Sequence, residues 1–190
     1  MPSKGNQYLV EAAPAILKKH PTARLFIIGE GELQSELEAQ AQALNLGDRL
    51  VFSGFQRDVA AVLSALDYLV FPSLWEGTPL TVFEALAMGK PMVATDADGL
   101  LDVLTHRKDA LIVPKADAPA LAAGVSAMID QPELASALAA EARQTGQRYD
   151  IAAFVRKMER LYDLLHETSR ATRRAGILKQ DLEFLNTQKR

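Results

Sequence analysis

Two acidic residues near the middle of the chain have the types and the spacing of a ligand-binding pair. Seven residues separate Glu76 from Glu84, and Glu76 follows the apolar run 68–71. A short continuous apolar run of this kind is typical of a buried parallel strand. Pro79 is favoured at the start of a helix and Gly89 just after its end. We therefore expect Glu76 on the loop that follows a strand and Glu84 in the first turn of the next helix.

This arrangement has a defined chemistry. A loop between a parallel strand and its helix lies at the carboxyl edge of the sheet, where open α/β sheets bind their ligands. The first amides of the helix carry partial positive charge and attract an anion such as a phosphate. Carboxylates on either side accept hydrogen bonds from hydroxyl groups. The pattern therefore predicts a ligand that carries both phosphate and hydroxyl groups, as a sugar nucleotide does.

Each acid also has a purely structural explanation. Thr81-x-x-Glu84 matches a capping box, in which the acid bonds an amide at the start of its helix, and Glu76 taken alone reads as an exposed loop acid. If the acids do bind a ligand, we expect them at opposite ends of a long molecule. Double-displacement glycoside chemistry needs two carboxyls about 5 Å apart, so a supporting role for Glu76 is favoured over that of a nucleophile.

Strands and helices alternate along most of the chain. Short apolar runs predict strands over 25–28, 50–52, 68–71, 92–94 and 111–113. Apolar residues at helical spacing and local start and stop signals predict helices over 8–17, 33–44, 59–66, 79–89, 101–104, 119–130, 132–147 and 151–166. Such alternation indicates βαβ units with a parallel sheet, which is an α/β fold class. Beyond Pro114 the chain is expected to be helical.

Composition limits the function classes. The chain has 190 residues, of which 48% are hydrophobic and 24% charged, with no cysteine and a net charge of −3. These values predict one globular domain without disulfides or thiolate zinc sites, and without a global charge that favours nucleic acid. No apolar run reaches the roughly 18 residues of a membrane-spanning helix, so a cytoplasmic location is expected.

The end of the chain differs in charge from the rest. Residues 167–190 contain six basic and three acidic residues and one potential apolar helix face. We therefore divide the chain into a domain over 1–166 and a basic helical or disordered tail over 167–190. The tail is interpreted either as a solvated terminal helix or as a helix that docks on a partner or a membrane surface.

The acidic pair lies inside a longer motif. The segment PS-x-x-EG-x-P-L-x-x-x-EA-x-A-x-G-K-P-x-V-A-T, residues 72–95, resembles the donor-site signature of family 4 (group 1) retaining glycosyltransferases of the GT-B fold. E-x7-E alone is a weak signal, and the preceding strand, the Pro-Ser pair and the following strand make it specific. The resemblance covers about Ser3 to His166. It implies a Rossmann-like parallel sheet flanked by helices, the carboxy-terminal donor-binding domain of that fold.

Two parts of the family's architecture are missing from the chain. In the family a strand that usually ends in Gly-Arg precedes a Lys-Gly pair, whereas here Lys4-Gly5 lies close to Met1. In the usual doubly wound order that strand is central, so its loss is expected to expose the edges of two neighbours. The amino-terminal acceptor domain is absent too. We interpret the chain as a fragment or a mis-called start, in preference to a natural short variant with a rebuilt sheet, and do not expect it to catalyse transfer alone.

The resemblance also implies a role for each residue of the motif. Glu76 would face the transferred sugar and stabilise positive charge at its anomeric carbon, and Lys4 would contact the diphosphate. Glu84 would accept hydrogen bonds from the ribose hydroxyls. The remaining donor contacts are implied for Gly77, Thr78, Leu80 and Thr81 beside the sugar and diphosphate, for Gly29 and Gly31 beside the nucleotide, and for Val51 near the base.

The implied activity is transfer of a hexosyl group, with retention, from a UDP-, GDP- or ADP-sugar to an acceptor hydroxyl in the full-length enzyme. No metal or cofactor is expected. Asp96-Ala97-Asp98 has the spacing of an Asp-x-Asp metal site but is interpreted as an ordinary loop segment after a strand. Peripheral contact of the full-length enzyme with the inner membrane face is a further expectation. The alternative is a non-catalytic nucleotide-binding or protein-interaction domain of the same fold. A nicotinamide dehydrogenase is disfavoured, because Gly29-Glu30-Gly31 lacks the third glycine of the dinucleotide fingerprint.

Overall fold

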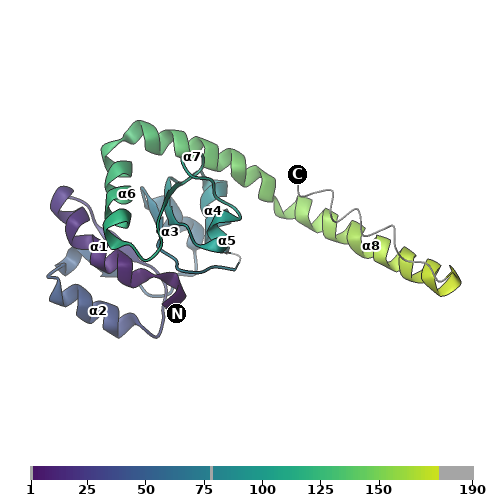
Figure 1. The fold of residues 1–190 in the computed structure, drawn as a ribbon, viewed down its shortest axis with the longest axis horizontal. Coiled ribbons are helices and arrows are strands. Elements are labelled where there is room, and N and C mark those ends of the chain that lie inside the picture. The colour runs from purple at the N-terminus through teal and green to yellow at the C-terminus, as the bar shows by residue number, and fades with distance from the viewer. Residues whose placement is uncertain (1, 78, 176–190) are drawn as a thin grey trace. The chain divides into compact units, whose positions relative to one another are not determined.

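The computed structural model describes residues 2–77 and 79–175 and divides the chain into two compact units, Met1–Arg148 and Tyr149–Arg190 (Figure 1). The described strands of the first unit are β1 (Leu25–Ile27), β2 (Leu50–Phe52), β3 (Leu69–Phe71), β4 (Met92–Thr95) and β5 (Leu111–Val113). Its helices are α1 (Asn6–Lys19), α2 (Gln34–Ala43), α3 (Val59–Ala65), α4 (Leu80–Met88), α5 (Asp98–Leu101), α6 (Ala118–Asp130) and α7 (Pro132–Gly146). The second unit contains α8 (Ile151–Ala175).

The strands form two parallel sheets. Strand β1 pairs with β2, with Leu25 opposite Leu50, and the second sheet has the order β3-β4-β5. Leu69 lies opposite Met92, and Val93 lies opposite Leu111. Within the described residues β1 pairs only with β2 and β3 only with β4, so each has an open edge. The expected parallel α/β fold is confirmed, with one open edge on β1 and one on β3 among the described strands.

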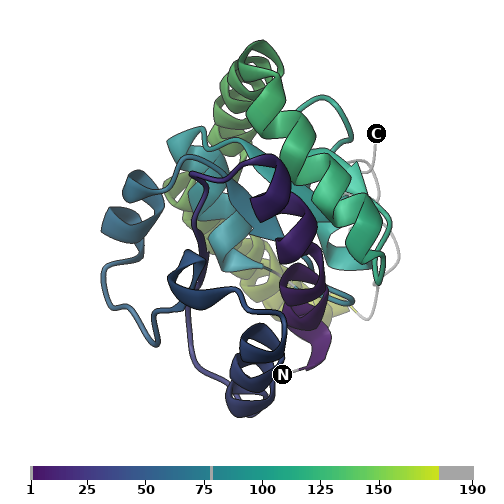
Figure 2. The same cartoon turned by 90° about the vertical axis from the view of Figure 1, so that its left-hand side faces the viewer.

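Helices cover the three-stranded sheet on both faces. Helix α6 packs against β4 and β5 and lies beside α1, as Figures 1 and 2 both show. Helix α4 packs against α3 and α7 in the other layer. The sheet is therefore buried between helices, which explains why its strands are continuous apolar runs rather than alternating ones.

Strand β4 carries side chains into a separate core on each face. All four residues of β4 are buried. Val93 belongs to the core formed with α1 and α6, whereas Met92 and Ala94 belong to the core formed with α3, α4 and α5. Successive side chains of a strand point to opposite faces, so one four-residue strand joins both cores and fixes the loops at its two ends.

Helix α4 begins slightly later than the sequence pattern suggests. Pro79 is the N-cap residue, with φ −77° and ψ 92°, and Gly89 ends the helix with φ 62°. The capping-box interpretation is wrong, because Thr81 and Glu84 both lie within the helix, and Glu84 lies beyond its first turn. Proline fixes φ near −65° and has no amide hydrogen, so the helix starts on it without a capping side chain.

The helix after β4 also starts earlier than expected. The sequence pattern places it over 101–104, whereas α5 spans Asp98–Leu101. Ala97 is its extended N-cap residue, and the Leu100 amide bonds the Ala97 carbonyl at 2.9 Å. Glycine lowers helix propensity, so the sequence pattern around Gly99 does not predict a helix there.

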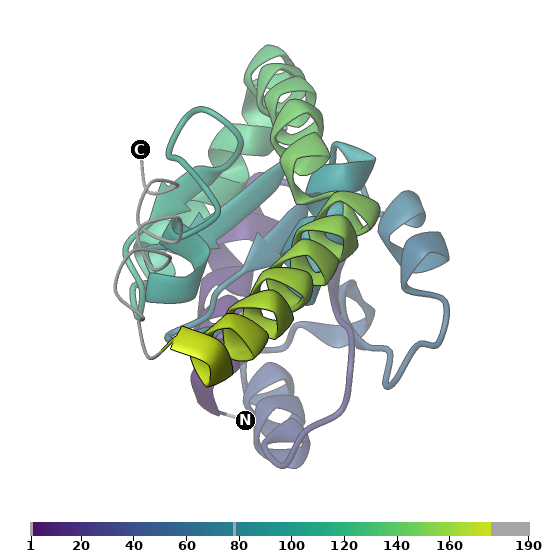
Figure 3. The same cartoon turned by 90° about the vertical axis from the view of Figure 1, so that its right-hand side faces the viewer.

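The carboxy-terminal part is helical, as expected. Helix α8 is a single uninterrupted helix (Figure 3) and continues past His166 to Ala175. The boundary expected between residues 166 and 167 therefore falls inside a helix, and the two compact units divide between Arg148 and Tyr149. Most of the basic tail, residues 176–190, lies outside the described residues. In the described part of the chain, no helix is both long and apolar enough to cross a membrane.

Candidate functional site

Glu76 lies on the loop that follows β3, as the sequence predicts, and its carboxylate is bonded on two sides. The Lys4 ammonium donates to Oε1 at 2.8 Å and to Oε2 at 3.0 Å. The Ser73 hydroxyl donates to Oε1 at 2.6 Å. The Glu76 side chain is 10% exposed, whereas that of Lys4 is 51% exposed. A mostly buried carboxylate therefore meets a cation that also reaches solvent.

The amino-terminal segment is attached to the same loop through its backbone. The Ser3 carbonyl accepts the Leu74 amide at 2.8 Å and the Trp75 amide at 3.4 Å. Gly5 has φ +63°, and a Cβ built on it would lie 1.9 Å from the Pro72 carbonyl oxygen. Only glycine permits this approach in this backbone conformation. These contacts hold Lys4 beside Glu76, although 72 positions separate the two residues in the sequence.

Helix α5 supports the loop from the other side. A Cβ built on Gly99 would lie 2.3 Å from the carbonyl oxygen of Glu76 and 2.5 Å from that of Gly77. The backbone of α5 therefore touches the backbone of the acidic loop directly. This contact makes the position of Glu76 depend on packing between the ends of β3 and β4.

A cavity of about 530 Å³ opens beside this loop, between the open edges of β1 and β3. Five of the residues that the sequence assigns to the site line it: Lys4, Gly29, Gly31, Glu76 and Thr81. Its walls are largely apolar and include side chains of α2, α3 and the two open strands. A cavity with largely apolar walls and a small number of polar groups is the usual form of a small-molecule site.

Other assigned residues lie outside the cavity lining. Leu80 and Glu84 are exposed on α4, Gly77 is exposed on the loop, and Val51 lies within β2. Thr78 lies outside the described residues. The structure thus brings Lys4 and Glu76 together, and the roles assigned to all the site residues stay predictions.

Sequence reasoning missed two buried hydroxyl residues behind Glu76. Ser73 and Thr95 are each 2% exposed. The Thr95 hydroxyl donates to the Ser73 carbonyl, and the Ser73 hydroxyl donates to Glu76. The Pro-Ser pair of the motif was the available signal, because a serine directly after a buried strand needs a hydrogen-bond partner.

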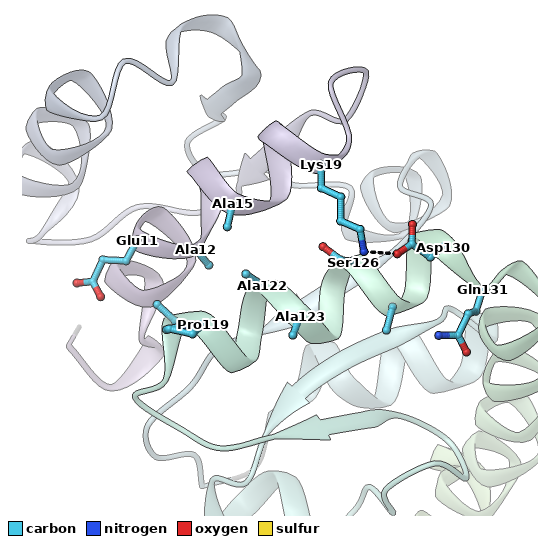
Figure 4. Close-up of a pocket in the computed structure, with 12 residues that line it drawn as sticks. Glu11, Ala12, Ala15, Lys19, Pro119, Ala122, Ala123, Ser126, Asp130 and Gln131 are labelled. Carbon is cyan, nitrogen blue, oxygen red and sulfur yellow. Dashed lines mark hydrogen bonds and ion pairs between the residues drawn. The ribbon is translucent and has the colours of Figure 1, made fainter.

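A second hollow, of about 570 Å³, lies between α1 and α6 and is lined mainly by alanines (Figure 4). Its charged pair is Lys19 with Asp130, and hydrogen bonding from Lys19 lowers the pKa of Asp130. The residues that line this hollow lie outside the motif. They are mostly small, and they include the Lys19–Asp130 ion pair. Among residues 2–77 and 79–175, no three histidine or acidic side chains converge as metal ligands.

Comparison with known proteins identifies relatives in sequence. The family described as glycosyl transferases group 1 matches residues 1–145. The uncharacterized glycosyltransferase MJ1059 of Methanocaldococcus jannaschii is 38% identical over 93 residues, which are 49% of this chain and 23% of that protein. An Escherichia coli enzyme, UDP-Gal:alpha-D-GlcNAc-diphosphoundecaprenol alpha-1,3-galactosyltransferase, is 34% identical over 119 residues, 61% of this chain and 31% of the enzyme. The chain thus spans about a quarter to a third of these relatives.

Solved structures agree in fold. The carboxy-terminal domain of a group 1 glycosyl transferase, LpcC from Francisella tularensis, matches with a TM-score of 0.72 and 26% identity, over 80% of this chain and 82% of that domain. HepE from Anabaena, in complex with UDP and glucose, matches with a TM-score of 0.79 over 86% of this chain and 45% of that one. At its 24% identity, the match to HepE concerns the fold alone.

The fold defines an α/β domain of the Rossmann-like type, with parallel strands flanked by helices. The family match over residues 1–145 is more specific. The chain belongs to the group 1 glycosyltransferases.

Proposed function

We propose that this chain is the donor-binding half of a family 4 retaining glycosyltransferase of hexosyltransferase type. The proposed ligand is a UDP-, GDP- or ADP-linked sugar. The observation that carries the proposal is the Lys4–Glu76 pair, with N···O distances of 2.8 and 3.0 Å, in the lining of a largely apolar cavity. A cation for phosphate and a carboxylate for hydroxyls are thus adjacent, as the diphosphate and sugar are adjacent in such a donor.

In this proposal the charged groups of the site stabilise different parts of the donor. Lys4 and the first amides of α4 stabilise the negative charge that develops on the leaving diphosphate, which is the role a metal ion has in other enzymes. Glu76 accepts hydrogen bonds from the sugar and stabilises positive charge at the anomeric carbon. Glu84, exposed on α4, accepts hydrogen bonds from the ribose. No metal is required in this scheme.

The acceptor hydroxyl and the groups that recognise it are assigned to a part of the protein outside this chain. The relatives are three to four times longer than the matched segment, which supports this division. We therefore expect donor binding, and no sugar transfer to an acceptor, from the purified 190-residue chain. A cytoplasmic location and contact with the inner membrane face stay predictions about the full-length enzyme.

Thermal unfolding with nucleotides tests the proposal. The purified chain is melted with UDP, GDP and ADP and with their glucose conjugates. A ligand at about 100 times its dissociation constant adds roughly 2.7 kcal/mol to the free energy of unfolding. For a chain of this size that corresponds to a midpoint about 5–11 °C higher.

A matched pair of variants makes this test specific. Glu84→Gln removes an exposed carboxylate from α4, and Glu11→Gln removes an exposed carboxylate from the middle of α1. The proposal predicts that the nucleotide response falls in Glu84→Gln and persists in Glu11→Gln. A cooperative melt that no nucleotide shifts in the parent chain contradicts the donor-site assignment and favours a non-catalytic domain of the same fold.

A further inference from the structure

We propose that Ser73 is a positioning residue that holds the Glu76 carboxylate in the orientation needed to bind the donor sugar. This inference rests on the proposed function. Its basis is the 2.6 Å hydrogen bond from Ser73 Oγ to Glu76 Oε1. Ser73 is 2% exposed and the Glu76 side chain 10% exposed, so water competes little for this bond.

Ser73 is itself fixed by the sheet. Its carbonyl oxygen accepts a hydrogen bond from the hydroxyl of Thr95, the last residue of β4, which is also 2% exposed. A series of hydrogen bonds therefore runs from the buried strand through Ser73 to Glu76. The torsion that turns a glutamate carboxylate about its last bond has a broad energy profile. Without Ser73, the packing around the side chain would leave that torsion less restricted.

Counting donors and acceptors shows which part of a ligand Ser73 affects. A carboxylate has about four acceptor positions and an ammonium has three donor hydrogens. Among the described residues, Oε1 accepts hydrogen bonds from Ser73 and Lys4, and Oε2 accepts one from Lys4 alone. Oε2 therefore keeps acceptor capacity for a sugar hydroxyl, and the third hydrogen of Lys4 can meet a phosphate oxygen. Ser73 thus orients the oxygen that binds sugar, and leaves the phosphate contact unchanged.

The prediction is a selective loss of affinity. Ser73→Ala is expected to weaken binding of UDP-glucose, or of the GDP or ADP conjugate if the parent chain prefers it, by about tenfold, the size of one hydrogen-bond contribution. Binding of the bare nucleoside diphosphate should change less than about twofold. Titration calorimetry with each pair of ligands measures the split. Ser126→Ala, which removes a buried hydroxyl from α6, is the control and should change neither affinity.

The outcomes separate a positioning role from a structural one. Equal losses for the sugar conjugate and the bare nucleotide, or no loss for either, overturn the inference. A parent chain that binds none of the nucleotides refutes the proposed function instead. In that case a ligand-free cycle of Ser73→Ala, Glu76→Ala and the double variant, followed by urea unfolding, decides whether the bond exists. Coupling between the two changes supports the bond, and additive changes contradict it.

Discussion

Gly5→Ala is the substitution that most directly tests how the amino-terminal segment is attached to the acidic loop. Gly5 has φ +63°, and an added Cβ would meet the Pro72 carbonyl oxygen at 1.9 Å. Gly47 is a matched control, because it has φ +57° and nothing within 4 Å of an added Cβ. Both variants therefore have the same backbone strain, and only Gly5→Ala has the collision.

The difference between the two variants can be estimated from the structure. An alanine in the left-handed conformation costs about 1–2 kcal/mol, and the stiffer unfolded chain offsets about 0.4–1 kcal/mol of that in both variants. Ordinary contact begins at 3.4 Å, so the segment at Gly5 must move by about 1.5 Å, the difference between 3.4 and 1.9 Å. Such a shift breaks the 2.8 Å bond between the Leu74 amide and Ser3, worth about 0.5–1.5 kcal/mol. It also separates Lys4 from Glu76, worth about 0–1 kcal/mol in a partly exposed pair.

Gly5→Ala should therefore be about 0.5–2.5 kcal/mol less stable than Gly47→Ala. For a chain of this size the midpoint of thermal unfolding should lie about 1–10 °C below that of the control. Differential scanning calorimetry measures both midpoints, and nucleotide titration should show weaker binding in Gly5→Ala alone. Equal midpoints and equal affinities in the two variants would refute the attachment of Lys4 to the acidic loop through Gly5.

Three further predictions concern other contacts. Asp130 has a pKa below its ordinary value of 3.8 because it accepts a hydrogen bond from Lys19, so its stabilising effect exists above pH 3.8 and is lost as pH falls through the lowered pKa. Acid unfolding of Asp130→Asn should lack this component, and unchanged acid unfolding would contradict it. From helix propensity alone, Gly99→Ala should stabilise α5 by about 0.5–1 kcal/mol. The added Cβ would lie 2.3 Å from the Glu76 carbonyl oxygen, so we expect the variant to be less stable than the parent. A raised melting midpoint would contradict this. Asp109 is 2% exposed and accepts hydrogen bonds from a backbone amide and a threonine hydroxyl. Asp109→Ala should therefore lower the free energy of unfolding, measured with urea, by at least about 1–3 kcal/mol. An unchanged free energy would show that both donors find new partners.

Local pattern was sufficient for most of the architecture. Each of the five strands lies where an apolar run predicts it. The run is clearest in β4, which is buried at every position and therefore has to be largely apolar. Gly89 ends α4 in the left-handed conformation, as its position after the helical pattern predicts. The start of α4 and the extent of α5 were predicted less well. Helix starts depend on capping geometry. A threonine caps a helix only where its own backbone is non-helical, whereas Thr81 lies within α4.

The sequence predicted which residues form the candidate site, but only part of how they are arranged in space. The sequence by itself placed Glu76 after a strand and made it part of a donor-site motif, because loop position and residue type are local properties. Only the tertiary structure decided that Lys4 reaches Glu76, that Gly5 packs on the Pro72 carbonyl and that Ser73 is buried behind the carboxylate. The Lys4 and Gly5 contacts depend on the packing of segments about 70 residues apart, and Ser73 is held by Thr95, 22 positions further along the chain. Side-chain types alone do not determine such packing.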